Sequence, residues 1–83
     1  MSMLHQFYLL EKYGPRLSIK QMSEAMSLTE SAIHRRISDG TLGIPTYVDS
    51  GKRWADARDM AEYFDTMRAA ARQHVARGAG LPA

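Results

Sequence analysis

Apolar residues in the first half of the chain recur at intervals of three and four, with one break. They are Ile19, Met22 and Met26 before the break, and Ile33 and Ile37 after it. This spacing places each set on one face of a helix. The break falls at Ser27 and Leu28. The pattern predicts two short helices joined by a turn, with Leu28 and the five spaced residues forming a common apolar seam.

The ends of both predicted helices carry residues suited to capping. Ser18 can cap the first helix, and Gln21 stands where the reciprocal partner of a capping box belongs. Thr29 offers an N-cap hydroxyl to the second helix, and Glu30 follows it in the first turn. Gly40 suits the left-handed position that ends a helix. These residues predict helices that begin after Ser18 and Thr29, the second ending at Gly40.

The second helix has a polar and basic outer face. With Ile33 and Ile37 turned inward, Ser31, Arg35 and Ser38 fall on the opposite face and His34 on its shoulder. This is the pattern of a DNA-binding helix-turn-helix. The same pattern of two amphipathic helices also occurs in domains that bind no nucleic acid.

A β-rich segment follows the second helix. Two strand-like runs, Thr46–Val48 and Arg53–Ala55, flank the polar loop Asp49–Lys52 and predict a β-hairpin with a four-residue loop. Lys52 and Arg53 lie at or beside its tip. Because Trp54 alternates with Arg53, we expect Trp54 to be buried. A basic hairpin in this place is either a wing that contacts DNA or a cover for the core.

The two ends of the chain are expected to be helical. Residues 3–13 favour a short helix, with a strand as the alternative, ended by Gly14 and Pro15. The last helix should start near Asp56 and run to about Val75. Its apolar stripe is expected to face the core, and comprises Met60, Phe64, Met67 and Ala71. Phe64 and Trp54 would close the core opposite the seam.

We expect one domain over residues 1–77 and a flexible tail over residues 78–83. Two apolar segments, residues 3–13 and the end of the last helix, exceed what a minimal domain needs. The second includes Met67, Ala70, Ala71 and Val75. We expect the two segments to pack together, either as a lid within one chain or as a homodimer interface.

Three segments carry a resemblance to a known family. They are Phe7–Gly14, the link Gly40–Pro45 with its Gly-x-Leu-x-x-Pro spacing, and Asp59–Asp65 in the last helix. Residues 17–65 resemble the winged helix-turn-helix of the phage excisionase and MerR-like superfamily, and the whole chain is similar to the pyocin-activator proteins of prophages. Asp49–Lys52 stands where those proteins often carry a Ser-Gln-Lys-like run. The resemblance implies a mainly α fold with a small β-hairpin, and a regulator of a phage or mobile element.

Composition and charge agree with a small binding module. The 83 residues carry a net charge of +2, and the cations gather in the second helix, the hairpin and the last helix. The absence of cysteine excludes a disulfide framework and fits a reducing cytoplasm. No apolar run approaches the roughly 20 residues that cross a bilayer, and the start lacks a signal-peptide pattern. We expect a cytoplasmic, nucleoid-associated protein that binds no membrane.

Catalytic chemistry finds no support in the sequence. The three histidines His5, His34 and His74 are far apart and lack ligand-like partners at metal spacing. No nucleophile with a base signature and no glycine-rich phosphate loop is present. Asp56 and Asp59 are better explained as residues that start a helix. We therefore expect no enzyme, no cofactor and no metal.

The expected activity is sequence-specific binding of duplex DNA by the second helix in the major groove. Arg35 would contact guanine, and Ser31 and His34 would read neighbouring base edges. Lys20, Thr29 and Arg36 are expected to contact phosphates. Lys52 and Arg53 would contact the DNA backbone or the adjacent minor groove. Such a protein would work as a homodimer or cooperative array. It would regulate transcription, with RNA polymerase as a possible partner. The alternatives are an excisionase-like factor that bends DNA for an integrase, and an antirepressor-like protein-interaction module.

Overall fold

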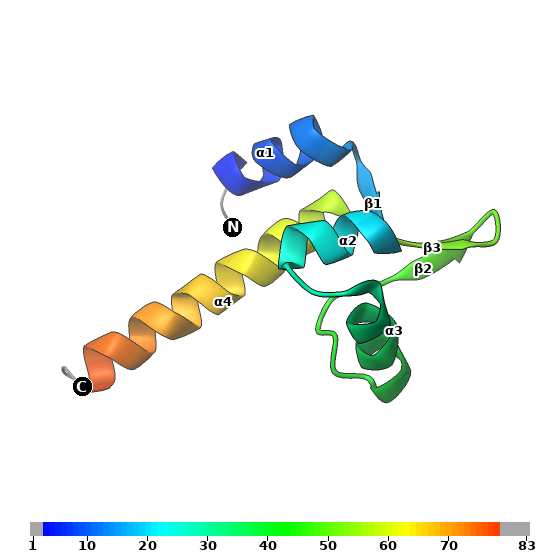
Figure 1. Ribbon diagram of the computed structural model, residues 1–83. Coiled ribbons are helices and arrows are strands. Elements are labelled where there is room, and N and C mark those ends of the chain that lie inside the picture. The colour runs from blue at the N-terminus through cyan, green and yellow to red at the C-terminus, as the bar shows by residue number, and fades with distance from the viewer. Residues whose placement is uncertain (1–2, 79–83) are drawn as a thin grey trace.

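The computed structural model describes residues 3–78, which form four helices and a small antiparallel sheet whose hairpin projects from one side of the molecule (Figure 1). In chain order the elements are α1 (Met3–Tyr13), β1 (Arg16–Ser18), α2 (Ile19–Met26), α3 (Glu30–Asp39), β2 (Tyr47–Asp49), β3 (Lys52–Asp56) and α4 (Ala57–Gly78). The mainly helical class and the small hairpin expected from the sequence are confirmed. Helix α4 reaches Gly78, the first residue of the expected tail, and residues 79–83 lie outside the described residues.

The predicted caps position α2 and α3. Ser18 Oγ accepts a hydrogen bond from the Gln21 backbone N–H at 3.3 Å, and Gln21 Oε1 accepts one from the Ser18 N–H at 3.0 Å. Thr29 Oγ1 accepts from the Ala32 N–H at 3.1 Å, and Gly40 ends α3 with φ 77°. A left-handed residue that the sequence did not reveal, Ser27 at φ 58°, ends α2. The tight turn that follows sets the angle between α2 and α3.

Strand β1 is an element that the sequence analysis missed. The sheet has the order β1-β3-β2, and all pairs are antiparallel. Leu17 pairs with Ala55, and both side chains are fully buried. A strand of three residues is too short to display the alternation that predicts strands. Its effect is large, however, because it joins the segment before α2 to the hairpin.

The hairpin turn is tighter than expected. Asp49 pairs with Lys52, so Ser50 and Gly51 alone form the loop, instead of the predicted four residues. Both loop residues have positive φ, 55° for Ser50 and 79° for Gly51. This conformation characterises the two-residue turns whose twist matches that of the flanking strands. Lys52 is thereby held in the ladder and not in a loose loop.

The core lies between the sheet, α2, α3 and the first half of α4. Met22 and Ile33 are fully buried as expected, whereas Leu28 and Ile37 are partly buried against the core. The remaining buried residues are Leu9, Leu17, Leu42, Ile44, Ala55, Ala57, Met60 and Ala61, with Met26 and Phe64 packed partly buried beside them. The prediction that Trp54 closes the core is wrong. Ala55 occupies the inward position on β3, and Trp54 therefore projects from the opposite face of the sheet.

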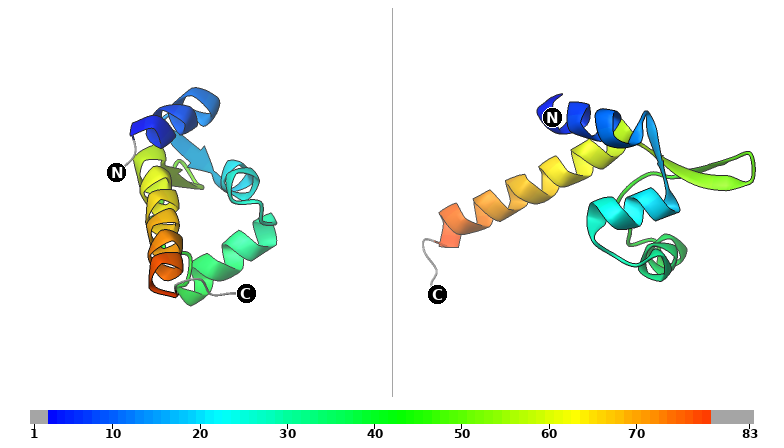
Figure 2. Two further views of the ribbon diagram at one scale, coloured as in Figure 1. Left: turned by 90° about the vertical axis from the view of Figure 1, so that its left-hand side faces the viewer. Right: turned by 45° about the horizontal axis from the view of Figure 1, so that its top comes forward.

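Helix α1 covers the first half of α4, as Figure 2 shows from two directions. Leu9 is 1% exposed, and the His5 ring stacks on Phe64 with centroids 5.0 Å apart. His5 Nδ1 also lies 3.5 Å from Asp65 Oδ1. The helical prediction for residues 3–13 is confirmed. The same contacts make α1 a lid on the core of its own chain.

The second half of α4 extends away from the rest of the molecule (Figures 1 and 2). A helix of 22 residues is about 33 Å long, and only its first half packs against the rest of the molecule. Met67, Ala71 and Val75 are consequently exposed. The expected core stripe is correct for Met60 and Phe64 and wrong for Met67 and Ala71. Nothing in the chain's own described residues covers this half of α4.

Candidate functional site

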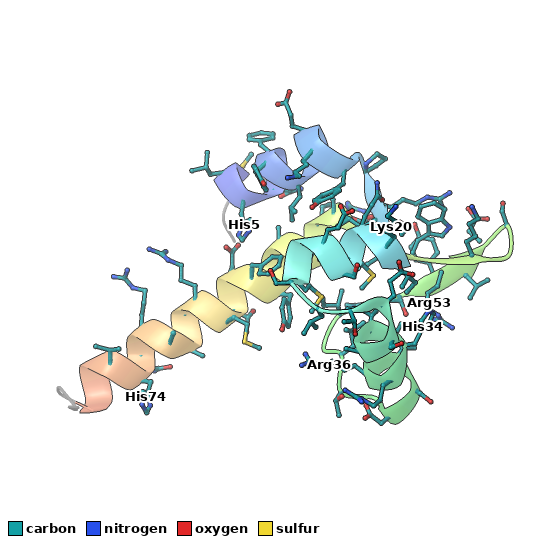
Figure 3. All side chains as sticks on the ribbon, viewed as in Figure 1. His5, Lys20, His34, Arg36, Arg53 and His74 are labelled. Atoms are coloured by element: carbon teal, nitrogen blue, oxygen red, sulfur yellow. The ribbon has the colours of Figure 1, made fainter. Side chains whose placement is uncertain are left out.

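A groove of about 540 Å³ opens between the start of α2, the side of α3 and the β2–β3 hairpin. Its polar lining consists of Ser18, Lys20, His34, Lys52 and Arg53, and we call it the basic groove. Figure 3 shows Lys20, His34 and Arg53 on this side of the molecule. Four residues that the sequence analysis assigned to a binding surface therefore meet in one place, although they come from three separate elements.

Local structure fixes the backbone at these positions. Lys20 stands in the first turn of α2, whose start is fixed by the Ser18 capping box. His34 follows the fully buried Ile33 on α3, which anchors the helix beneath it. On the hairpin, Arg53 Nη1 donates a hydrogen bond to Thr46 Oγ1 at 2.9 Å. The groove is thus formed by residues whose backbones are tied to the core or the sheet.

The outer face of α3 continues the surface beyond the basic groove. Ser31 and Arg35 are both exposed there, as the helical spacing predicted. Asp39 lies one turn after Arg35, and its carboxylate accepts hydrogen bonds from the Thr41 hydroxyl at 2.6 Å and the Thr41 N–H at 3.2 Å. The Thr41 hydrogen bonds and the charge of Arg35 lower the pKa of Asp39 below its usual value. This face therefore presents a guanidinium beside a fixed carboxylate.

The other two expected site residues lie outside the basic groove. Thr29 is exposed at the start of α3, where its hydroxyl oxygen already accepts the capping hydrogen bond. Arg36 lies on the opposite flank of α3 from His34, as Figure 3 shows. There it lines a separate, smaller groove of about 140 Å³ with Ile37 and Thr46. Helix α3 thus carries basic residues on both flanks as well as on its outer face.

A cluster on the back of the sheet fixes the hairpin, and the sequence analysis missed it. Arg16 lies over the Trp54 ring, 3.9 Å from its centroid, and Arg16 Nη1 donates to Asp49 Oδ2 at 2.8 Å. Trp54 Nε1 donates to the Asp49 carbonyl oxygen at 3.2 Å. The Arg16 hydrogen bond lowers the pKa of the Asp49 carboxyl. These contacts join β1 to the hairpin. Because the sequence did not predict β1, no pattern in it could indicate these contacts.

The chemistry of the basic groove is that of an anion-binding surface. Its lining residues, as the structure describes them, include two lysine or arginine side chains from β3, one lysine from α2 and one histidine from α3, and none is acidic. Within residues 3–78, no group of three histidine, cysteine or acidic side chains is placed to hold a metal ion. An open cationic groove beside a polar helix face suits a long anionic ligand better than a small enclosed one.

No family model, curated protein or solved structure matches this chain. What the chain does must therefore be inferred from the placement of its own residues. Across residues 3–78, no helix has the length and apolar character needed to cross a membrane.

Proposed function

We propose that this chain is a winged helix-turn-helix protein that binds duplex DNA sequence-specifically. In this proposal α2 and α3 are the helix-turn-helix, α3 is the recognition helix and the β2–β3 hairpin is the wing. One observation carries the proposal: cations from α2 and β3 and a histidine from α3 converge in the basic groove, directly beside the exposed polar face of α3. A polyanion lying along α3 would meet all of them together.

The proposed docking places α3 in the major groove, which is wide enough to admit a helix. Arg35 would donate both arms of its guanidinium to a guanine, while Ser31 and His34 face neighbouring base edges. Lys20, Lys52 and Arg53 would contact one DNA backbone. Arg36, on the other flank of α3, would reach the backbone across the groove, and Thr29 would donate its hydroxyl to a phosphate. The two flanks of α3 then position the helix, and its outer face reads the sequence.

A single module of this kind buries only about 600–1,000 Å² of protein surface on DNA. We therefore propose that two or more copies bind together, as a homodimer or a cooperative array. The similarity of the chain's full-length plan to the pyocin-activator proteins of prophages supports transcription control in a phage or mobile element as the biological role. An excisionase-like role would use the same surface, and the two roles differ in the promoter or attachment site that is bound.

The test combines DNA selection with three matched variants. Duplexes selected from a random pool should share one motif. Arg35→Ala should lower the affinity for this motif about 5- to 150-fold and relax the base preference at one base pair. Lys52→Ala should lower the affinity for all sequences alike, and should reduce the slope of log affinity against log salt concentration by about one unit. Arg72→Ala removes an equally exposed cation from the far half of α4 and should change neither property. Equal losses in all three variants would show that net charge, and not this surface, binds DNA.

A further inference from the structure

His34 differs from the other basic residues of the groove in its charge. Lys20, Lys52 and Arg53 are cations at neutral pH, whereas histidine changes its charge between pH 5 and 8. His34 lies on the shoulder of α3 that faces the hairpin, so it belongs both to the groove and to the recognition surface. A proton on the His34 ring would therefore add one positive charge to the groove.

The charged groups around His34 come from each element that forms the groove. Lys20 faces it from α2, and Lys52 and Arg53 face it from the hairpin. Glu30 lies one turn earlier on α3, at its exposed start, and is the acid closest to His34 along the helix. Arg35 follows His34 directly on α3. Lysine and arginine side chains thus outnumber acidic ones around the imidazole.

A phosphodiester in the groove reverses this balance. It brings one negative charge close to the imidazole, and an imidazolium can donate two N–H hydrogen bonds where a neutral ring donates one. We propose that the basic groove holds a backbone phosphate of the bound DNA, that His34 contacts this phosphate and not a base edge, and that it takes up one proton when the phosphate enters. The inference rests on the proposed DNA binding and adds a regulation of that site, because affinity for DNA would rise as the pH falls.

The experiment measures the affinity of the full chain for its selected duplex between pH 5.5 and 8.0 at constant ionic strength. If one proton is taken up on binding, the affinity of the wild type for the duplex should fall by up to about tenfold for each unit by which the pH rises, within the range in which histidine titrates. His34→Gln, which keeps a hydrogen-bond donor but cannot become charged, should bind with little dependence on pH. It should match the wild type near pH 8 and fall below it near pH 6.

His74→Gln is the matched control, because His74 is exposed on the free half of α4, far from the groove. It should retain the wild-type pH dependence. A pH dependence that persists unchanged in His34→Gln would overturn the inference, and so would wild-type affinity that is constant over the range. Loss of duplex binding at every pH would instead overturn the proposed function, so the two failures are distinguishable.

The source of the phosphate is tested by following the His34 ring resonances of the full chain by NMR at pH 6.5. Addition of the duplex should shift these resonances toward the protonated form, and the absence of a shift would overturn the inference. Inorganic phosphate, compared with chloride at equal ionic strength, provides the second arm. A shift with the duplex alone assigns the groove to the DNA backbone, whereas an equal shift with millimolar inorganic phosphate would overturn that assignment.

Discussion

Two isoleucines on α3 provide a direct test of the packing. Ile33 is fully buried, whereas Ile37, one turn later, is only partly buried against the same core. Replacing each by alanine removes the same atoms from the same helix, so the gain in helix propensity is equal and cancels in the comparison. The difference between the two variants therefore reports burial alone.

The expected magnitudes follow from that difference. Ile33→Ala loses the full transfer free energy of the side chain and leaves a closed cavity, which together cost about 2–5 kcal/mol. Ile37→Ala loses less buried area and opens to solvent, so we expect about 1–2 kcal/mol. Val75→Ala, on the free half of α4 where Val75 is 64% exposed, should stay within about 0.5 kcal/mol. For a domain of this size, whose total stability is on the order of 4–12 kcal/mol, Ile33→Ala approaches unfolding.

Urea unfolding followed by circular dichroism gives the three free energies of unfolding, and thermal melts give the same order. Each kcal/mol corresponds to a shift of about 4–8 °C in a domain of this length. Equal destabilisation by Ile33→Ala and Ile37→Ala would refute the described packing of α3, because it would require equal burial. A large effect of Val75→Ala would show that the second half of α4 is packed in solution, as a homodimer would require.

Four further outcomes are expected. Arg16→Ala should accelerate amide exchange across β1 and β3 and leave the α2 amides unchanged, since Arg16 ties the two strands through Trp54 and Asp49; unchanged exchange in β3 would contradict this. The pKa values of Asp49 and Asp56 are lowered by hydrogen bonds from Arg16 and Arg58, so their contribution to stability is complete above about pH 4 and is lost as the pH falls through the lowered values. Melting temperatures of wild type and Asp49→Asn should therefore converge in acid, and a constant gap would refute the coupling. Gly51→Ala should destabilise by about 1–3 kcal/mol because φ is 79°, although a Cβ there meets open space, and a stable Gly51→Ala variant would contradict the turn geometry. Deletion of residues 1–12 should lower the melting temperature because it uncovers the core under Leu9; light scattering on both forms shows whether α1 also holds two copies together.

Local patterns in the sequence were sufficient to predict the helices and their caps. The capping box at Ser18 and the cap at Thr29 depend only on residues three positions away, so both can be recognised without tertiary information. The burial of Met22 and Ile33 follows from helical spacing for the same reason. The same periodicity placed His34 on the shoulder of the second helix, where the structure forms the basic groove.

The errors concern features that depend on distant partners. Trp54 was assigned to the core because it alternates with Arg53 on a strand that must bury one face, yet the pairing of Leu17 with Ala55 determines which face of β3 is inward. Leu42 and Ile44 are buried although they belong to no helix or strand. Met67 was expected inside because its spacing continues that of Met60 and Phe64. Periodicity defines a face of a helix, but it cannot show where the body that covers this face ends.

The pairing of β1 with β3 also determines how the molecule can be divided. Arg16 lies opposite Asp56, so the sheet closes a loop that contains all of α2, α3 and β2. A fragment that begins at Ile19 would keep both helices and the hairpin but lose Leu17 and leave β3 as an open edge. We therefore expect the helix pair and hairpin to be unable to fold when excised at their own boundaries, and the smallest autonomous unit to begin before Arg16. Because this closure spans about forty residues, we expect the pairing of β1 with β3 to form after the local structures of α2, α3 and the β2–β3 hairpin.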